Sequence, residues 1–517
     1  MNKKLSVSII ASVAAMLFLS FSKTVILQEP WKAPAGADTL KRPFPPSPPV
    51  IREGENLFNT YCVSCHGKTG HGDGSPGKFK IEPANFHSKA VTDQTDGALF
   101  WKMTTGRGMM PAYGAALSEE KRWQLVAYIR QFPRQNSGLA STSNKPSLPL
   151  ANYKIDVKIP GEYFPLPEKV KNVVNSESQL FMVDTVVTGL NRPWSMVFLP
   201  NKTALIAERG GKLLLVKDGR VQSTPIGGNV PMNLRDVKLH PKFEQNKLVY
   251  ISYYLDPVKP DVRGYTILMR AKLVGDKLVD EKILYKAGPF KGNGEWFGSK
   301  IAFDKKGYVF FTVGIRGERK NAQDLSVPDG KTMRLKDDGS IPSDNPFVNT
   351  PGALPEIYSY GHRMHEGLVC DPKTGNILST EFGELGGDEL NVIKRGLNYG
   401  WPIVTFSLEY NGSIISKSPF LEGMEPPVHH FAIAPSDVDF VYGDQYPSWN
   451  GNVFMGGLAT KLLYRVVMKN NIMTHEERLL ETIGRVRDVK YAPDQLLYVM
   501  TEDTGIIVRL IPLKKIK

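Results

Sequence analysis

The segment AFDKKGYVFFTVG, residues 302–314, joins two apolar runs through a short polar turn. Such a unit is typical of two strands connected by a tight turn. The same unit recurs in VFLPNKTALIAE (197–208), KLHPKFEQNKLVYISYY (238–254), VCDPKTGNILSTEFG (369–383), VYGDQYPSWNGNVFMGGL (441–458) and YAPDQLLYVMTED (491–503). The interval between successive units is long enough for about four strands. Closing the resulting sheets into a ring removes exposed sheet edges. Six units therefore predict a six-bladed β-propeller over residues 181–514, whereas two β-sandwiches would not explain the recurrence.

The start of the chain differs in character from the propeller. MNKKLSVSIIASVAAMLFLSFSK has two lysines followed by an apolar run, the pattern of an export signal. Residues 1–22 are predicted to be a signal peptide or a retained N-terminal anchor. We therefore expect an exported protein, periplasmic or otherwise outside the cytoplasm, for which peripheral or anchored membrane association stays open.

Composition narrows the possible partners. The 517 residues carry a net charge of +13, but no nucleic-acid-binding motif accompanies the basic residues. A solvated basic surface is the simpler interpretation, and we expect no nucleic-acid partner. The chain has three cysteines, too few for the disulfide framework of a small secreted domain.

Two composition shifts divide the chain. Residues 23–50 contain a proline-rich stretch that predicts an extended, semi-rigid spacer. The polar stretch from Arg134 to Lys154 begins a linker that we extend to residue 180. Between them, residues 51–133 show helical periodicity, including a capped start at Ser118. The sequence thus predicts a mixed multidomain chain, with a small all-α domain followed by an all-β six-bladed propeller.

The helical domain contains the motif Cys62-Val63-Ser64-Cys65-His66. Two thiols one helical turn apart can form thioethers with a porphyrin, and the adjacent histidine then ligates the iron. A thioredoxin-like pair would need a βαβ context, and a zinc site would need further ligands at finger spacing. The motif therefore predicts covalently bound haem c.

A second axial ligand is expected from the segment TTGRGMMPAYG, residues 104–114. Thioether and imidazole ligation together raise the reduction potential, which suits an electron acceptor. Met110 precedes a proline and is the preferred candidate. Met109, His71 and His87 stay open as alternatives.

The run from Ile51 to Phe132 resembles the class I cytochrome c family in YCVSCHG, GHGDG, PANF, TDGALFWKMTTGRGMMPAYG and SEEKRWQLVAYIRQF. This resemblance implies a small helical electron-transfer domain. It further implies that Cys62 and Cys65 carry the thioethers, that His66 is the proximal ligand and that Met110 is the distal ligand.

The propeller region resembles the glucose/sorbosone dehydrogenase family. The similarity lies in GLNRPWSMVFLP, AQDLSVPDGKTMRLKDDGSIPSDNPF, YSYGHRMHEGL, TEFGELGGDELNVI, LNYGWP, FAIAPSDVDFVYGDQYPSW and RVRDVKYAPDQLLYV. These proteins are six-bladed propellers that bind pyrroloquinoline quinone (PQQ) and calcium at the propeller mouth and oxidise aldoses. The resemblance implies that Arg363, Arg485 and Arg487 contact PQQ or substrate. Backbone carbonyls of Gly383 and Glu384 would hold calcium.

Several positions depart from the family pattern. Trp296 lies where the family has the histidine that acts as general base, and an indole has no basic lone pair. The resemblance leaves Glu295 and His365 as candidate replacement bases. Other family residues are replaced as well: asparagine by Met364, proline by His365, glutamine by Glu366, a second glutamine by Pro231 and lysine by Ala459, with Lys461 two residues after the last.

Two functions follow from this combination. In the first, a PQQ-dependent dehydrogenase oxidises a sugar or a related alcohol or aldehyde. It passes electrons to its own haem and then to an acceptor in the respiratory chain. In the second, the propeller is a catalytically silent binding module, and only the cytochrome domain transfers electrons. The fused cytochrome domain favours the first function, and the replaced residues at the propeller mouth favour the second.

Overall fold

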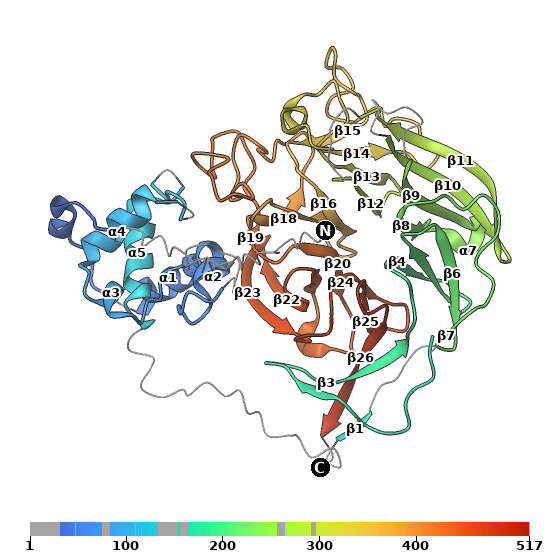
Figure 1. The fold of residues 1–517 in the computed structure, drawn as a ribbon, viewed down its shortest axis with the longest axis horizontal. Helices are drawn as coiled ribbons and strands as arrows, with labels where there is room; N and C mark the ends of the chain where they lie inside the picture. Colours follow the sequence, from blue (N-terminus) through green and yellow to red (C-terminus); the bar gives the residue numbers. More distant parts are fainter. Residues whose placement is uncertain are drawn as a thin grey trace, which may run out of the picture.

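The computed structural model describes residues 31–46, 48–74, 83–108, 110–114, 116–132, 153–155, 163–255, 264–290 and 296–515. A small helical domain lies beside a larger ring of β-sheets (Figure 1). The predicted fold class, an all-α domain followed by a six-bladed propeller, is confirmed. The proposed signal or anchor, most of the stretch from Arg134 to Lys154, Met109 and Glu295 lie outside the described residues.

The helical domain is built from short helices around an aromatic core. They are η1 (Ala35–Thr39), α1 (Pro48–Tyr61), α2 (Val63–His66), α3 (Lys89–Thr92), α4 (Asp96–Thr105) and α5 (Glu119–Ile129). As expected, Ser118 caps α5, and its Oγ accepts a hydrogen bond from the Lys121 amide. Helices α1 and α5 cross closely at Gly54, where a Cβ would lie 2.1 Å from the Gln124 carbonyl oxygen. The packing of α1 on α5 places α2, with its cysteine motif, at one side of the domain.

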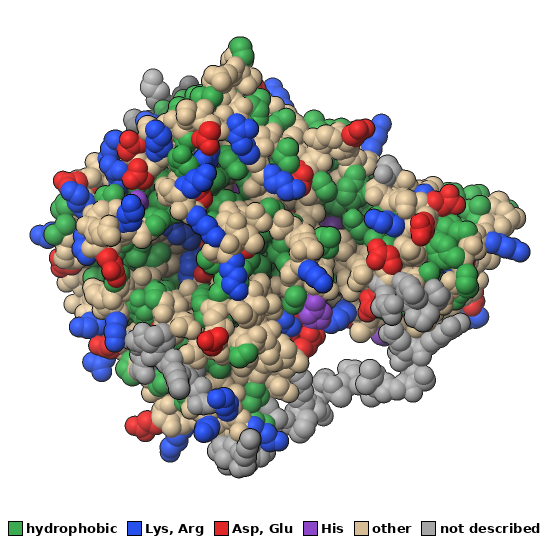
Figure 2. Space-filling model, turned by 180° about the vertical axis from the view of Figure 1, so that it is seen from behind, with side chains coloured by type: hydrophobic (Ala, Val, Ile, Leu, Met, Phe, Trp, Pro, Cys, Tyr) green, Lys and Arg blue, Asp and Glu red, His purple; other side chains and the backbone are tan. Residues whose placement is uncertain are grey.

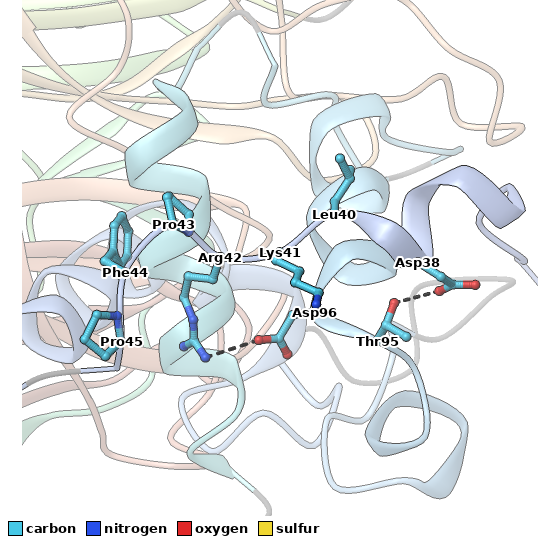
Figure 3. A pocket seen from close by; sticks show the side chains of 9 residues that line it. All are labelled: Asp38, Leu40, Lys41, Arg42, Pro43, Phe44, Pro45, Thr95 and Asp96. Carbon is cyan, nitrogen blue, oxygen red and sulfur yellow. Dashed lines mark hydrogen bonds and ion pairs between the residues drawn. The ribbon is translucent and has the colours of Figure 1, made fainter.

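The proline-rich stretch is not the separate spacer that composition predicted, because its described part packs on the helical domain. Figure 3 shows Asp38 bonded to Thr95 and Arg42 paired with Asp96. Thr95 Oγ1 donates to Asp38 Oδ1 at 2.6 Å, and the Arg42–Asp96 ion pair measures 3.3 Å. Gly97 lets η1 approach α4 without a clash. In addition, α1 already begins at Pro48, because proline is tolerated in the first turn of a helix. Composition alone could not reveal these long-range polar contacts.

In the described part of the chain, five propeller blades are antiparallel sheets of four strands, and the sixth sheet has six strands. Blade 1 is β4 (Pro193–Phe198), β5 (Ala204–Glu208), β6 (Lys212–Lys217) and β7 (Arg220–Val221). Blade 2 is β8 (Leu234–Leu239), β9 (Leu248–Leu255), β10 (Tyr265–Val274) and β11 (Lys277–Ala287). Blade 3 is β12 (Gly298–Phe303), β13 (Val309–Val313), β14 (Lys331–Leu335) and β15 (Ile357–Tyr360).

Blade 4 is β16 (His365–Cys370), β17 (Ile377–Glu381), β18 (Asp388–Ile393) and β19 (His429–Phe431). Blade 5 is β20 (Pro435–Val441), β21 (Asn452–Gly457), β22 (Leu462–Lys469) and β23 (Ile472–Leu479). Blade 6 joins β24 (Val486–Tyr491), β25 (Leu497–Thr501) and β26 (Ile507–Lys515) to β3 (Leu180–Val187), with β2 (Val173–Asn175) and β1 (Tyr153–Ile155) at its edges. Three short helices, α7 (Phe243–Asn246), η3 (Arg319–Gln323) and η4 (Pro447–Trp449), lie between strands.

The ring closes because the first and last parts of the domain share blade 6. The inner strands β4, β8, β12, β16, β20 and β24 contact one another in turn, and β24 returns to β4. Strand β3 pairs antiparallel with β26, so that Asp184 lies opposite Arg509. This shared sheet leaves no gap between the first blade and the last.

Two general properties of the surface bear on partners. No helix in the described part of the chain is long and apolar enough to cross a lipid bilayer. On the face shown in Figure 2, Lys and Arg side chains are scattered and interspersed with Asp and Glu. This distribution agrees with a solvated basic surface on that face.

The contacts that close the propeller ring can be tested through their effect on its stability. Arg509 is fully buried, donates to Asp184 Oδ2 at 3.0 Å and also donates to the carbonyls of Phe164 and Pro165. We expect Arg509→Ala to lower the free energy of unfolding of the propeller by about 3–5 kcal/mol, because buried Asp184 loses its buried partner and keeps the half-exposed Lys171 at 3.4 Å. Urea unfolding followed by tryptophan fluorescence measures the change.

The control for the closure variant is Lys272→Ala, which breaks the exposed Lys272–Asp280 pair. An exposed pair contributes about 0–1 kcal/mol. Equal effects of the two substitutions would contradict a special role for Arg509 in closure.

Candidate functional site

A cavity of about 280 Å³ lies between the helical domain and the propeller. We call it the haem cavity because the cysteine–histidine motif lines it. The helical domain contributes Tyr61, Cys62, Cys65, His66, Met110 and Tyr113 among its lining residues. The propeller contributes Leu385, Gly386, Gly387, Phe406, Leu408 and His430, among others. Segments more than 300 residues apart in the sequence therefore form one cavity.

The His66 imidazole is held in the neutral tautomer that a metal ligand requires. Its Nδ1 lies 3.0 Å from the carbonyl oxygen of Ala84. A carbonyl only accepts, so Nδ1 carries the hydrogen and Nε2 keeps its lone pair. Burial lowers the pKa of His66, and the Ala84 carbonyl opposes this shift in part. A neutral imidazole oriented through its other nitrogen is the usual state of a histidine ligand.

The two cysteines of the motif line the same cavity. Both are free thiols rather than a disulfide. Burial raises the pKa of both thiols, and the nearby Cys65 raises that of Cys62 further. Two reduced thiols, a neutral imidazole and the Met110 thioether in one cavity fit a covalently attached haem.

The alternative axial ligands are placed differently. The imidazoles of His71 and His87 contact each other, with ring centroids 4.2 Å apart. His87 Nε2 also lies 2.7 Å from the Thr69 carbonyl oxygen. Neither histidine is among the described residues that line the haem cavity. Their positions favour Met110 over either histidine.

A second cluster lies on the propeller and contains one of the arginines singled out from the sequence. We call it the mouth cluster: Trp296, Arg319, Arg363, Glu384 and Trp401. Arg363 is buried, and its guanidinium lies 5.5 Å from the ring centroid of each tryptophan. Arg319 donates to Glu384 at 2.6 Å. Arg319 also pairs with Glu409, and Glu384 lies 3.7 Å from Arg363, so two carboxylates offset the two guanidinium groups. The cluster thus combines ion-paired arginines with flat aromatic surfaces, which suits a planar polar ligand.

The other two arginines are already engaged by protein groups. Arg487 is buried and donates to Glu366 and Glu502, at 2.8 and 2.5 Å. Its guanidinium also lies 3.8 Å from the Trp194 ring centroid. Arg485 is partly exposed and donates to the Leu458 carbonyl. Arg363 is engaged as well, since it lies 3.7 Å from Glu384 and donates to the Phe382 carbonyl at 3.1 Å. Arg487 pairs with two carboxylates and Arg363 with one, so Arg363 is the better placed of the two to bind an added carboxylate.

A short loop connects the mouth cluster to the haem cavity. Within residues 383–387, Glu384 lies in the mouth cluster, whereas the three residues that follow it line the haem cavity. Asp388 fixes this loop, since its Oδ1 accepts from the Gly383 amide at 2.9 Å. Its Oδ2 accepts from the amides of Ile433 and Ala434, both at 2.8 Å. Opposite ends of one fixed loop thus reach two sites.

Of the two candidate bases, only His365 belongs to the part of the chain that the structure describes. Glu295 lies outside the described residues. His365 is fully buried beside Thr332, His362 and Glu381, and burial lowers its pKa to about 3. A substrate could not reach this imidazole without opening the blade.

Sequence reasoning missed the propeller side of the haem cavity. Phe406 lies between β18 and β19, and His430 lies within β19. No local motif marks Phe406 or His430, because the cysteine motif that they face belongs to the other domain. The only signal was a pair of histidines, His429 and His430, in a short apolar strand.

The helical domain and the propeller together define an electron-transfer domain joined to a dehydrogenase-type β-propeller. Residues 190–509 match the model of the Glucose / Sorbosone dehydrogenase family, and the chain belongs to that family. Residues 49–129 match the model described as cytochrome c oxidase, cbb3-type, subunit III. Both resemblances noted from the sequence are confirmed.

Characterised relatives match the propeller part of the chain. Aldose sugar dehydrogenase YliI of Escherichia coli is 35% identical, over 64% of this chain and 92% of that protein. The structure of the soluble aldose sugar dehydrogenase from Escherichia coli, in the apo-form, is 33% identical with a TM-score of 0.61, covering 65% of this chain and 99% of that one. The PQQ-bound aldose sugar dehydrogenase from Streptomyces coelicolor is 27% identical with a TM-score of 0.51, covering 66% and 100%.

Proposed function

We propose that this chain is an exported haem c oxidoreductase. Its propeller would be a PQQ- and calcium-dependent dehydrogenase for a sugar or a related alcohol or aldehyde. When bound, PQQ supplies the two-electron chemistry, and haem supplies a one-electron acceptor. The electrons would then leave for an acceptor in the respiratory chain.

The proposal assigns roles to residues of both sites. Cys62 and Cys65 attach the haem, and His66 and Met110 ligate its iron. Arg363 binds a carboxylate of the quinone or a group of the substrate. We give Arg485 and Arg487 supporting roles, because both are engaged by protein groups. Main-chain carbonyls of Gly383 and Glu384 would hold calcium, since the Glu384 carboxylate is already bonded to Arg319.

The loop of residues 383–387 is the observation that carries this proposal. It contributes Glu384 to the mouth cluster and Leu385 to the wall of the haem cavity. An electron donor at the mouth cluster would therefore lie one short loop away from its acceptor. Joining donor and acceptor in one chain removes the bimolecular encounter between them.

A second function has its own support. By the sequence resemblance, Trp296 would stand where the family has its basic histidine, and an indole offers no basic lone pair there. Glu366, where the family has glutamine, is bonded to Arg487 and offsets its charge. These features favour a silent binding module, with electron transfer by the cytochrome domain alone.

A dye-linked assay separates the two functions. The purified haem protein is incubated with PQQ, Ca²⁺ and an artificial electron acceptor, and a panel of sugars, alcohols and aldehydes is added. If the propeller is a dehydrogenase, a substrate should be oxidised, and the oxidation should stop when Ca²⁺ is chelated or PQQ is omitted. Failure to oxidise any member of the panel, despite measured PQQ binding, would support the binding module.

A further inference from the structure

The propeller wall of the haem cavity is formed by blade 4 and the segment that precedes β19. Strand β19 contacts both α1 and α2, and α1 also contacts β23 (Figure 1). The wall places Leu385, Phe406, Leu408 and His430 opposite the cysteine motif. The contact surface of the two domains is thus centred on the part of the cytochrome domain that carries its chemistry.

His430 joins this wall to the motif itself. Its Nδ1 lies 3.4 Å from Oγ of Ser64, the residue directly before Cys65. Its ring stacks on Phe406 with centroids 3.9 Å apart and planes 13° from parallel. His430 is buried, and burial lowers its pKa to about 4, so the ring is neutral at pH 7. A neutral imidazole stacked on a phenyl ring is compatible with an apolar cavity.

Contacts around the cavity hold the two domains in this arrangement. Lys68 pairs with Glu177 at 3.3 Å, and Arg478 donates to the Gly74 carbonyl at 3.1 Å. Tyr61 makes an edge contact with Phe420, with ring centroids 6.3 Å apart. Charged contacts therefore lie at the periphery and aromatic contacts near the cavity, as in specific protein interfaces.

We propose that Phe406 and His430 of the propeller are residues of the haem site. They close the cavity on the side that the helical domain leaves open and keep water out of it. The haem of this chain would then be a shared site of two domains. This assignment is independent of whether the propeller oxidises a sugar.

The assignment has a measurable consequence for the reduction potential. Burial and the apolar shell around a haem raise its potential, because water stabilises the more highly charged oxidised iron centre. Removing part of the propeller wall admits water. We therefore expect Phe406→Ala and His430→Ala to lower the midpoint potential of the haem and to alter its absorption spectrum.

The test is a mediated redox titration of the full-length haem protein, followed by visible absorption. It needs neither substrate nor PQQ, so its failure is distinct from failure of the proposed dehydrogenase. The matched control is His240→Ala, because His240 is a buried propeller histidine in the turn between β8 and β9 and does not line the haem cavity. The milder Phe406→Leu provides the same comparison if either alanine variant fails to fold.

A downward shift in the wall variants, with His240→Ala matching the wild type, would support the assignment. Wild-type potential and spectrum in the wall variants would overturn it. A shift of equal size in His240→Ala would also overturn it, since general loosening of the propeller would then be the cause.

Discussion

A Cys62→Ala, Cys65→Ala double variant is expected to lose all covalently bound haem. Thioether attachment needs a sulfur at each of these positions, and both line the haem cavity. Acidic acetone should leave haem on the denatured wild-type protein and none on the double variant. Visible absorption of the extracted protein measures the difference.

Cys370→Ala is the matched control for haem attachment. Cys370 is the third cysteine of the chain, lies in β16 of the propeller and is partly buried. Its removal should leave haem content unchanged. Haem that resists extraction in the double variant would contradict thioether attachment at the motif.

The second large effect is expected at Trp296. A general base typically contributes about 10²–10⁴-fold in rate, and an indole cannot take a proton from the substrate hydroxyl. We therefore expect the wild-type protein, loaded with PQQ and Ca²⁺, to oxidise glucose poorly or not at all. Trp296→His should raise the rate of glucose oxidation, by up to the roughly 10²–10⁴-fold that a general base contributes. Initial rates with aldoses and an artificial acceptor provide the measurement.

Trp401→His is the control for the tryptophan variant. Trp401 also lies 5.5 Å from the Arg363 guanidinium, measured to its ring centroid, so this variant changes the same surroundings without restoring the family's histidine. It should not gain glucose oxidation. Rapid oxidation of glucose by the wild type, unaffected by substitution at Glu295 and His365, would contradict this interpretation of the site.

The sequence was sufficient to predict the fold because its signals are local. Each hairpin unit carries its own apolar runs and turn, so residues 302–314 and their counterparts predicted the blades now seen as sheets. The cysteine motif and the cap at Ser118 are likewise contained within a few residues. Both family resemblances rest on such continuous segments.

Other features depend on pairs of distant residues and could not be predicted. The proline-rich stretch looked like a spacer because Arg42 and Asp96, which hold it on α4, are far apart in the sequence. The pairing of Arg487 with Glu366 joins two blades. His430 reaches the cysteine motif only when the two domains meet. In each case the decisive partner is set by tertiary structure.

Under the proposed function, the mouth cluster and the haem cavity act together in one chain. The most direct test is anaerobic rapid mixing of the PQQ- and Ca²⁺-loaded haem protein with an oxidisable substrate, followed by the absorbance of reduced haem. Electron transfer within the chain predicts first-order reduction of the haem with a rate constant that does not change with protein concentration. Haem that stays oxidised while an added dye is reduced, or an apparent rate constant that rises in proportion to protein concentration, would contradict electron transfer within the chain.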